Sequence, residues 1–328
     1  MLIRVFDMWA VIVLVLLLRG ARSEALGALE AVLPSYLLEN VEDLVRTASA
    51  ACEILPLELF FSRRSRAEMA PLDVVEYTRG GVRSLRAGEV PAAAAVLYVP
   101  GWWNTPTDEA ARALAAALLQ HHPALLVLDT RRAFARGYLS AAARVDGVAH
   151  LLYRFIRGLD DAGISPATLH VVGFSLGAHV AGMAGKLVQK GLNTKLGRIT
   201  ALDPAKPCFT RSRHRLQRND AKFVQVIHSS AGVLGLEEPV GHVDVYVNGV
   251  AVTQPECRHR SISFECDHNQ AWKVFAASAA PGAARAMRAR LCAGWQELLA
   301  AACSGPPAPL GYPASGSARG MFLYKSGS

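Results

Sequence analysis

One stretch in the middle of the chain limits the fold more than any other: Val171 to His179, with the sequence VVGFSLGAH. The residues over 168–173 predict a buried strand, and residues 176–189 predict a helix directly after it. The glycines of the G-x-S-x-G pattern permit a sharp turn between the two, in a strained conformation that exposes the side chain of Ser175 at the helix N-terminus. The stretch is typical of an α/β sheet with a reactive serine at its edge.

Strands and helices alternate through most of the remaining sequence. Further strands are expected at 95–99, 124–128, 198–202, 222–227, 242–247 and 321–324, and further helices at 108–121, 138–156 and 268–280. This alternation predicts a mostly parallel central sheet with helices on both faces. Residues 25–66 are harder to assign, with a helical stretch at 38–52 and a strand-like one at 57–61. Since no change of composition marks a second domain, we expect a single domain over residues 24–328.

The first residues have the pattern of a secretory signal. Arg4 precedes an apolar run from Met8 to Leu18, and the small residues Ala21 and Ser23 follow. The run would rise only about 16 Å as a helix, against roughly 30 Å of hydrocarbon, so a signal peptide over residues 1–23 is favoured over a membrane anchor. We therefore expect a secreted, extracellular protein whose cysteines pair in an oxidising environment.

Composition narrows the class of protein further. Hydrophobic residues make up 52% and charged residues 19% of the 328 residues, which excludes an intrinsically disordered chain. The 35 Lys and Arg exceed the 27 Asp and Glu, and the resulting charge of +8 permits attraction to an anionic membrane surface without identifying a partner. No nucleic-acid partner is expected.

A serine nucleophile requires a general base and a carboxylate that orients the base, and in this fold class they follow in the order serine, acid, histidine. Asp203 ends the predicted strand at 198–202, so its side chain is expected at the carboxyl edge of the sheet; the alternative is an aspartate that only stabilises a turn. The candidate bases after it are His214, His228, His242, His259 and His268. His214 lies among arginines and is predicted to be solvated, whereas His228 and His268 are about equally suited by spacing alone.

Longer stretches of the chain resemble the pancreatic lipase family, the secreted animal lipases and phospholipases A1, and in particular its short-lid, single-domain, insect-like members. The resemblance extends from about Leu57 to Tyr324. The stretches that carry it are Val171–Gly182 (VVGFSLGAHVAG), Gly197–Phe209 (GRITALDPAKPCF), Arg215–His228 (RLQRNDAKFVQVIH), Val240–Asp244 (VGHVD) and Cys266–His268 (CDH).

The resemblance implies an α/β-hydrolase fold and a set of roles for individual residues. Ser175 would be the nucleophile, Asp203 the acid and His268, rather than His228, the base. The backbone N–H groups of Trp102 and Leu176 would form the oxyanion hole.

Several positions depart from the family pattern. Pro100-Gly101-Trp102 stands where the family usually has His-Gly before the aromatic oxyanion residue, Asp129-Thr130 replaces a common Asp-Trp, and Gln270 replaces an arginine after the histidine. Because a backbone N–H is the expected oxyanion donor, the first change is compatible with activity. The calcium-binding carboxylates of some members are mostly absent.

At the positions of those calcium ligands the chain has Ser212 and Gln217, and only Asp220 keeps a carboxylate. We therefore expect no bound metal, and no cofactor is implied.

The family pattern also assigns the cysteines. It implies a disulfide between Cys257 and Cys266 that closes a lid over the site, and a second between Cys292 and Cys303. Cys208 would be a free thiol, as in many relatives, with Cys52 left over; a bridge between these two remains open, because connectivity cannot be deduced from sequence.

The lid is short, with the residues RHRSISFE over 258–265. A short lid and a short loop at 229–240 resemble the phospholipase A1 branch, and a short polar lid leaves the entrance open. Arg258 and Arg260 would lie near the rim, where they could pair with a phosphate or simply be solvated. Since the sequence ends at Ser328, neither a C-terminal β-sandwich domain nor a colipase partner is expected.

Taken with the resemblance, the residues predict a secreted serine carboxylic ester hydrolase. Its substrates would be acyl lipids at a lipid interface or membrane surface: phospholipids cleaved at the sn-1 ester, neutral glycerides, or both, through an acyl-enzyme. The alternatives are a catalytically weak lipid-binding or yolk-type storage protein of the same fold, and an esterase for small esters.

Overall fold

The computed structural model describes Cys52 and residues 73–85, 89, 91, 96–135, 137–259 and 263–326. These residues all belong to Val45–Ser328, one of the two units into which the chain divides. The predicted signal peptide at 1–23, the strand at 57–61 and, apart from Cys52, the helix at 38–52 lie outside the described residues, as does Arg260. Over the described part, no helix combines the length and the apolarity needed to span a bilayer.

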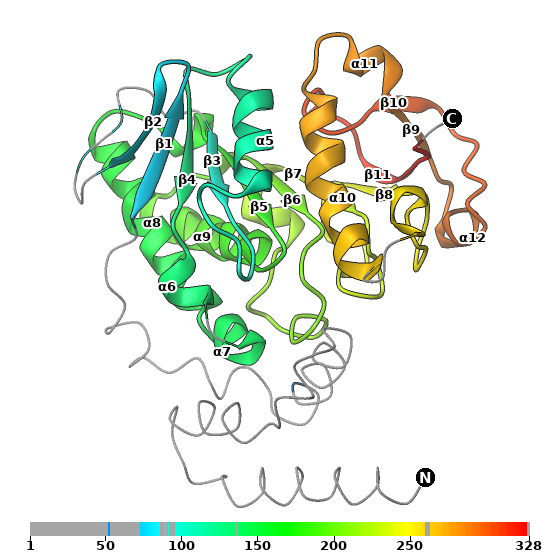
Figure 1. Ribbon diagram of the computed structural model, residues 1–328, viewed down its shortest axis with the longest axis horizontal. Coiled ribbons are helices and arrows are strands. Elements are labelled where there is room, and N and C mark those ends of the chain that lie inside the picture. The colour runs from blue at the N-terminus through cyan, green and yellow to red at the C-terminus, as the bar shows by residue number, and fades with distance from the viewer. Residues whose placement is uncertain are drawn as a thin grey trace, which may run out of the picture. The chain divides into compact units, whose positions relative to one another are not determined.

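A mixed sheet of eleven strands organises this part of the chain, in the order β10-β9-β11-β8-β7-β6-β5-β3-β4-β1-β2 (Figure 1). The strands are β1 (Val74–Thr78), β2 (Gly81–Leu85), β3 (Val96–Val99), β4 (Ala124–Leu128), β5 (His170–Phe174), β6 (Leu196–Leu202), β7 (Ala221–His228), β8 (Val243–Val247), β9 (Arg288–Leu291), β10 (Pro307–Pro309) and β11 (Gly320–Tyr324). The central strands from β4 to β11 run parallel. At the two ends, β1 and β2 and then β9 and β10 pair antiparallel, so the predicted mostly parallel sheet is confirmed.

Helices cover both faces of this sheet. They are α5 (Glu109–Leu118), α6 (Arg131–Phe134), α7 (Tyr138–Ala143), α8 (Val145–Asp161), α9 (Leu176–Leu192), α10 (Ser263–Ser278), α11 (Ala283–Ala286) and α12 (Trp295–Leu299), with 3-10 turns η4 (Pro166–Thr168), η5 (Arg218–Asp220) and η6 (Pro255–Cys257). Successive strand residues point to opposite faces, so Val171 of β5 packs with α7, α8 and α9, whereas Val172 packs with α5 and α10. Both faces are therefore buried, as the long apolar runs of the strands require.

The parallel register brings three chain segments to one edge of the sheet. Phe174 at the end of β5 pairs with Leu202 at the end of β6, and Leu202 pairs with Ile227 near the end of β7. The residues that follow these strands, from Ser175, Asp203 and Ser229 onward, therefore leave the sheet side by side at its carboxyl edge.

Some elements differ from those predicted. The helix expected over 138–156 is two helices, α7 and α8, because the Arg144 N–H bonds to the Ala141 carbonyl in a tighter turn that ends α7. The strand expected at 168–173 begins only at His170, after η4, and the helix expected from His268 begins already at Ser263.

Four strands were not expected at all: β1, β2, β9 and β10. β2 and β10 lie at the two ends of the sheet and are largely exposed, and all four are short strands with few consecutive apolar residues. They lack the buried apolar run by which the central strands were recognised.

Candidate active site

Ser175 lies on the tight turn between β5 and α9 that the sequence predicts. Its backbone has a positive φ of 55°, and its N–H donates to the Leu202 carbonyl at 2.9 Å. A Cβ on Gly177 would come within 2.1 Å of the Val99 carbonyl oxygen, so only glycine permits β3 to pass this close to the turn. Ser175 is thereby held at the carboxyl edge of the sheet and at the positive end of α9.

Asp203 follows β6 and is fully buried. Its carboxylate accepts hydrogen bonds from the N–H groups of Ser229 and Ser230, at 2.8 and 3.1 Å, and from the Ser230 hydroxyl. It also accepts one from Nδ1 of His268 at 2.6 Å. Burial raises the pKa of this carboxyl group, but the contacts with His268 and Ser230 outweigh burial and lower the pKa below its usual value. Asp203 is therefore an ionised carboxylate that orients an imidazole.

The imidazole of His268, carried by α10, contacts Asp203 and also lies near the turn of Ser175. Its ring centroid is 4.6 Å from that of Phe174, the residue before the serine. Because an ionised carboxylate only accepts hydrogen bonds, Nδ1 carries the proton and Nε2 is left as the basic nitrogen. Among the described residues no hydrogen bond joins Ser175 to His268; such bonds are often long before substrate binds.

His228, which spacing alone left as an equal candidate, lies in a different environment. It is fully buried, with Nε2 3.0 Å from Oδ1 of Asp244 and Nδ1 3.0 Å from the Leu236 carbonyl oxygen. Both ring nitrogens of His228 contact groups other than Asp203. The structure therefore pairs Asp203 with His268.

The prediction that His214 is solvated is wrong. Its side chain is only 18% exposed and lies 3.7 Å from Asp146 of α8. The arginines beside it in the sequence indicated an exposed loop, but the fold places this histidine against a helix that lies far away in sequence.

The loop after β3 lies directly against the turn that carries Ser175. A Cβ on Gly101 would come within 2.9 Å of the Ser175 Cβ, so the backbone leading into Trp102 passes beside the serine. On the other side, the N–H of Leu176 opens α9, where no preceding helical turn uses it. Both predicted oxyanion donors therefore belong to segments that adjoin the serine.

The same loop presents an aromatic surface. Trp102 stacks on Trp103 with ring centroids 4.0 Å apart and meets Tyr138 edge-on at 5.3 Å. Trp103 has a positive φ of 60° and is 59% exposed. A left-handed backbone costs a bulky residue about 1–2 kcal/mol. Because the indole of Trp103 is mostly exposed, burial of this side chain offsets little of that cost. The sequence analysis missed Trp103, although the Trp-Trp pair was a visible signal.

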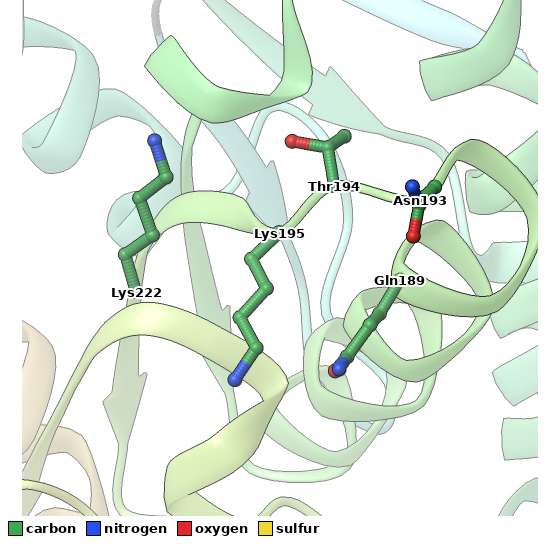
Figure 2. Close-up of a pocket in the computed structure, with 5 residues that line it drawn as sticks. All are labelled: Gln189, Asn193, Thr194, Lys195 and Lys222. Carbon is green, nitrogen blue, oxygen red and sulfur yellow. The ribbon is translucent and has the colours of Figure 1, made fainter.

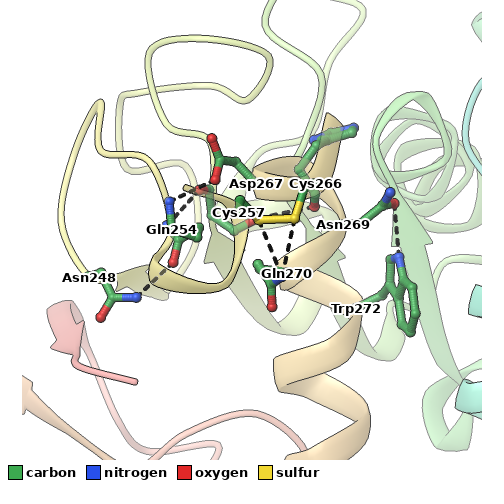
Figure 3. Close-up of a disulfide and its surroundings, with 10 residues drawn as sticks. Asn248, Gln254, Cys257, Cys266, Asp267, Asn269, Gln270 and Trp272 are labelled. Atoms are coloured by element: carbon green, nitrogen blue, oxygen red, sulfur yellow. Dashed lines mark hydrogen bonds between the residues drawn. A yellow bond between two sulfur atoms is a disulfide. The ribbon is translucent and has the colours of Figure 1, made fainter. Parts of the chain in front are cut away.

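A disulfide joins Cys257 to Cys266 with an S–S distance of 2.02 Å, at the expected boundaries of the lid. The last three residues of the predicted lid, 263–265, already belong to α10. Figure 3 shows the side-chain amide of Gln270, where the family has an arginine, against both sulfur atoms at 3.6 and 3.8 Å. The disulfide therefore ties Cys257 to the helix that carries His268.

Gln254, which the sequence analysis also missed, ties the loops around the histidine together. Its buried side-chain amide donates to the carbonyl oxygens of Ser229 and Val247 at 2.9 and 3.0 Å. Its backbone N–H donates to the carboxylate of Asp267, the neighbour of His268, at 2.7 Å (Figure 3). No motif marks this glutamine in the sequence, since its partners lie on three separate segments.

All six cysteines are paired in the structure. Besides the lid disulfide, Cys292 bonds to Cys303, and Cys52 bonds to Cys208. The bridge that the sequence left open is therefore formed, and the free thiol suggested by the family pattern is not present.

An open pocket of about 290 Å³ lies at the opposite edge of the sheet (Figure 2). Its lining residues are Gln189, Asn193, Thr194, Lys195 and Lys222. Lys195 precedes β6 and Lys222 lies near the start of β7, so the pocket is at the amino ends of the parallel strands. Figure 2 also shows the two ammonium groups pointing in different directions. The pocket is therefore separate from Ser175, Asp203 and His268.

Comparison with known proteins identifies relatives of this chain. The chain is 40% identical over 147 residues to lipase member H of Xenopus tropicalis, a match that covers 43% of this chain and 31% of that protein. It is 43% identical over 144 residues to phospholipase A1 member A of Rattus norvegicus, covering 42% of this chain and 30% of that protein. The matched segment thus spans less than a third of each relative's length.

Among solved structures, an alpha-beta serine hydrolase homologue from Coxiella burnetii is similar with a TM-score of 0.36 and 13% sequence identity, covering 63% of this chain and 96% of that one. A family model described as Lipase matches residues 90–314. This match includes the turn of Ser175, Asp203, His268 and the lid, and it shows that the chain belongs to the pancreatic lipase family.

Proposed function

We propose that this protein is a secreted serine carboxylic ester hydrolase that cleaves the acyl esters of lipids. The observation that carries the proposal is the 2.6 Å hydrogen bond between Nδ1 of His268 and the carboxylate of Asp203, formed beside the turn that presents Ser175. The ring of His268 also lies against Phe174, the residue before Ser175, which supports the roles that a serine hydrolase requires of these three residues. Membership of the lipase family supports the same conclusion.

The chemistry follows from the roles of these groups. Nε2 of His268 takes the proton of the Ser175 hydroxyl as its oxygen attacks the ester carbonyl carbon. Asp203 stabilises the imidazolium that forms and keeps the ring in the correct tautomer. The proton is then passed to the departing alcohol as the ester C–O bond breaks. A water molecule, deprotonated by the same nitrogen, then attacks the acyl carbonyl carbon. The bond to the Ser175 oxygen breaks, this oxygen takes the proton back from His268, and the fatty acid leaves.

The negative charge of each tetrahedral intermediate requires donors beside the serine. The backbone N–H groups of Trp102 and Leu176 would supply them, since both segments adjoin Ser175. A preorganised donor of this kind contributes about 10²–10³-fold to kcat. Because the donors are backbone groups, the replacement of the family's His-Gly by Pro100-Gly101 leaves this function in place.

Long-chain lipids are the substrate class that the surroundings of the site support, either phospholipids at the sn-1 ester or neutral glycerides. The exposed indole of Trp103 lies next to the oxyanion loop, and tryptophan suits the boundary between water and lipid. Arg258 is exposed at the short lid, where it could pair with a phosphate. A lipid surface is therefore the partner that we propose.

Secretion is supported by two features. Three disulfides are formed in the structure, which suits an oxidising compartment. The apolar run at 8–18 has the length of a signal peptide rather than of a membrane span.

The test is covalent labelling with a fluorescent organophosphate followed by an ester hydrolysis assay. We expect label on Ser175, and we expect Ser175→Ala to lose label and at least about 10³-fold of kcat. Ser165→Ala, which changes an exposed serine at the start of η4, should retain both. A folded protein that takes no label and cleaves no ester would instead be a lipid-binding or storage protein.

Substrate preference is tested with phosphatidylcholine and triolein, each presented in the same mixed micelles. The short lid predicts cleavage of phosphatidylcholine at the sn-1 ester at a rate at least comparable to that of triolein. A strong preference for triolein would contradict this assignment of the lid.

A further inference from the structure

A buried ion pair holds α9 against the segment that leads from Asp203 to β7. Nζ of Lys186 donates to Oδ2 of Asp220 and to the Arg215 carbonyl oxygen, both at 2.7 Å. The Asp220 side chain is 2% exposed and that of Lys186 is 30% exposed. Oδ2 of Asp220 also accepts the Gln217 N–H at 2.7 Å, within the capping box of η5. One ammonium group thus joins the middle of α9 to two points of this segment.

The helix is shaped to receive the segment. A Cβ on Gly182 would come within 2.6 Å of the Leu216 Cα, and a Cβ on Gly185 within 2.2 Å of the Asp220 carbonyl oxygen. Glycine at both positions therefore permits the backbone of the segment to lie directly on α9. Lys186 follows these glycines and is the cation at this contact.

This is also where the sequence retains a remnant of a calcium site, and the residues do not fit that metal. Calcium requires six to eight oxygen ligands at 2.3–2.6 Å. Asp220 Oδ2 and the Arg215 carbonyl both contact Nζ of Lys186, and the Ser212 hydroxyl accepts the His214 N–H at 3.0 Å. No group of three or more His, Cys, Asp and Glu that could hold a metal occurs within the described residues. An ammonium group and a calcium ion cannot share one set of oxygens.

We propose that the Lys186 ammonium is a built-in cation that replaces a bound divalent metal in this chain, clamping residues 203–220 to the helix that begins after Ser175. A tethered ammonium neutralises the buried Asp220 carboxylate and binds a carbonyl oxygen. It cannot be removed by a chelator. The protein is therefore independent of calcium for its stability.

The clamp also affects the candidate active site, because Asp203 is the first residue of the clamped segment. His179, on the same helix, contacts the segment as well: its Nε2 is 2.7 Å from the Ala205 carbonyl oxygen, and its Nδ1 accepts the Leu216 N–H at 3.3 Å. Lys186 is thus a positioning residue that fixes the acid relative to the nucleophile. This last step rests on the proposed function, whereas the stability of the clamp does not.

The experiment measures thermal unfolding of the full secreted chain with and without cations. Wild type should keep its melting temperature, within about 1 °C, in EDTA and in 5 mM calcium. Lys186→Ala should lower the melting temperature by roughly 5–10 °C, because it leaves Asp220 buried without its partner. Lys190→Ala, which removes an exposed lysine one turn further along α9, should change it by less than about 2 °C.

Rescue separates a cation role from a packing role. Since the shortened side chain leaves space beside Asp220, 50 mM ethylammonium should restore at least half of the loss in Lys186→Ala, and none in Lys186→Ala/Asp220→Asn. If the alanine variant does not fold, Lys186→Met serves instead, because methionine keeps an unbranched stem of similar length without the charge. Refolding of the alanine variant is then also compared with and without ethylammonium. Three results would overturn the proposal: a Lys186→Ala variant as stable as wild type, a destabilised variant that ethylammonium does not restore, or a wild-type protein that calcium stabilises.

An activity readout belongs to the same series. Lys186→Ala should lose about tenfold in kcat, recovered by ethylammonium together with the melting temperature. If wild type lacks esterase activity but the thermal rescue occurs, the proposed function fails and the built-in cation stands. If wild type has normal activity but no thermal rescue is seen, the built-in cation fails and the proposed function stands.

Discussion

The carboxylate of Asp203 depends on its neighbours for its charge and its direction. Ser230 gives it both a backbone N–H and a hydroxyl, and Ser229 gives it a second N–H. The backbone of Gly235 packs directly against this carboxylate. A Cβ at that position would come within 2.4 Å of Oδ1, so only glycine permits the contact. These groups lie in the loop after β7 and hold the carboxylate ionised and fixed, with Oδ2, which also accepts the Ser230 hydroxyl, directed toward Nδ1 of His268.

Replacing the acid by its amide tests this arrangement. Asp203→Asn should lower kcat by about 10³–10⁴-fold with little change in folding, because an amide that donates to Nδ1 stabilises the wrong tautomer of His268. Steady-state kinetics and circular dichroism are the measurements, with the exposed Asp161→Asn as control. An Asp203→Asn enzyme with more than a tenth of wild-type kcat would contradict the assignment.

The Ser230 hydroxyl should affect the pH dependence of catalysis. It contributes to lowering the pKa of Asp203, so Ser230→Ala should raise that pKa toward its usual value. Any loss of kcat/KM that follows protonation of this carboxylate should then begin at a higher acidic pH, whereas activity at neutral pH should change little, because a carboxyl group with its usual pKa is still ionised there. A uniform loss at every pH, with no shift of this acidic loss, would indicate only a packing defect.

Among the elements, α9 does more than present the serine. Its first turn carries Leu176, its next turn places His179 under the segment after Asp203, and its glycines receive that segment. His179 is fully buried, and its ring stacks on Phe209 with centroids 4.0 Å apart. Burial lowers the pKa of His179 to about 3. The hydrogen bond to the Ala205 carbonyl raises this pKa, but by less than burial lowers it. The helix and the acid segment are thus joined through a neutral imidazole.

This neutral histidine makes stability depend on pH in a stated direction. An unfolded histidine titrates near 6.5, so between pH 6.5 and about 3 the unfolded chain binds a proton that the folded chain does not. The free energy of unfolding should therefore fall as the pH falls through this window, by about 3 kcal/mol between pH 6.5 and pH 4.

Urea unfolding at several pH values measures this slope. His179→Gln should be less stable at pH 7 but should show a shallower slope between pH 6.5 and pH 4. Some slope should remain, because the buried His170 also has a lowered pKa. A variant with the wild-type slope would exclude His179 as the titrating group.

For the whole molecule, the disulfides constrain regions of very different size. Cys52–Cys208 links residues 156 apart in sequence, and Cys292–Cys303 links residues 11 apart. The first joins a region before the sheet to the segment after Asp203, whereas the second closes a local loop beside β9. A cross-link that closes a longer loop removes more entropy from the unfolded chain.

Removing each bridge should therefore have unequal effects. Chain entropy predicts a loss of about 5 kcal/mol for Cys52→Ser/Cys208→Ser and about 3 kcal/mol for Cys292→Ser/Cys303→Ser. Guanidinium unfolding of the purified variants, with esterase activity of the folded fraction, provides the comparison. Equal losses would mean that local packing, rather than loop closure, determines the contribution of each bridge.

The sequence by itself determined the central strands, the helices α5 and α9, and the turn that exposes Ser175. These are local properties: apolar runs, a helix cap and a glycine pattern act over a few residues, so they can be read in order along the chain. The antiparallel strands at the sheet ends were not recognised, because they are short and lack a continuous apolar run: β1 is buried but is interrupted by Glu76, and the others are partly exposed.

The family resemblance implied His268 and two of the disulfides, but residue spacing alone did not determine which groups meet, and the tertiary structure decided this. Spacing left His228 and His268 equal; the fold gives His228 to Asp244 and His268 to Asp203. It likewise placed Lys186 on Asp220 and joined Cys52 to Cys208. Each of these contacts joins residues from different elements, and their positions follow from sheet register and helix packing, which no short stretch of sequence encodes.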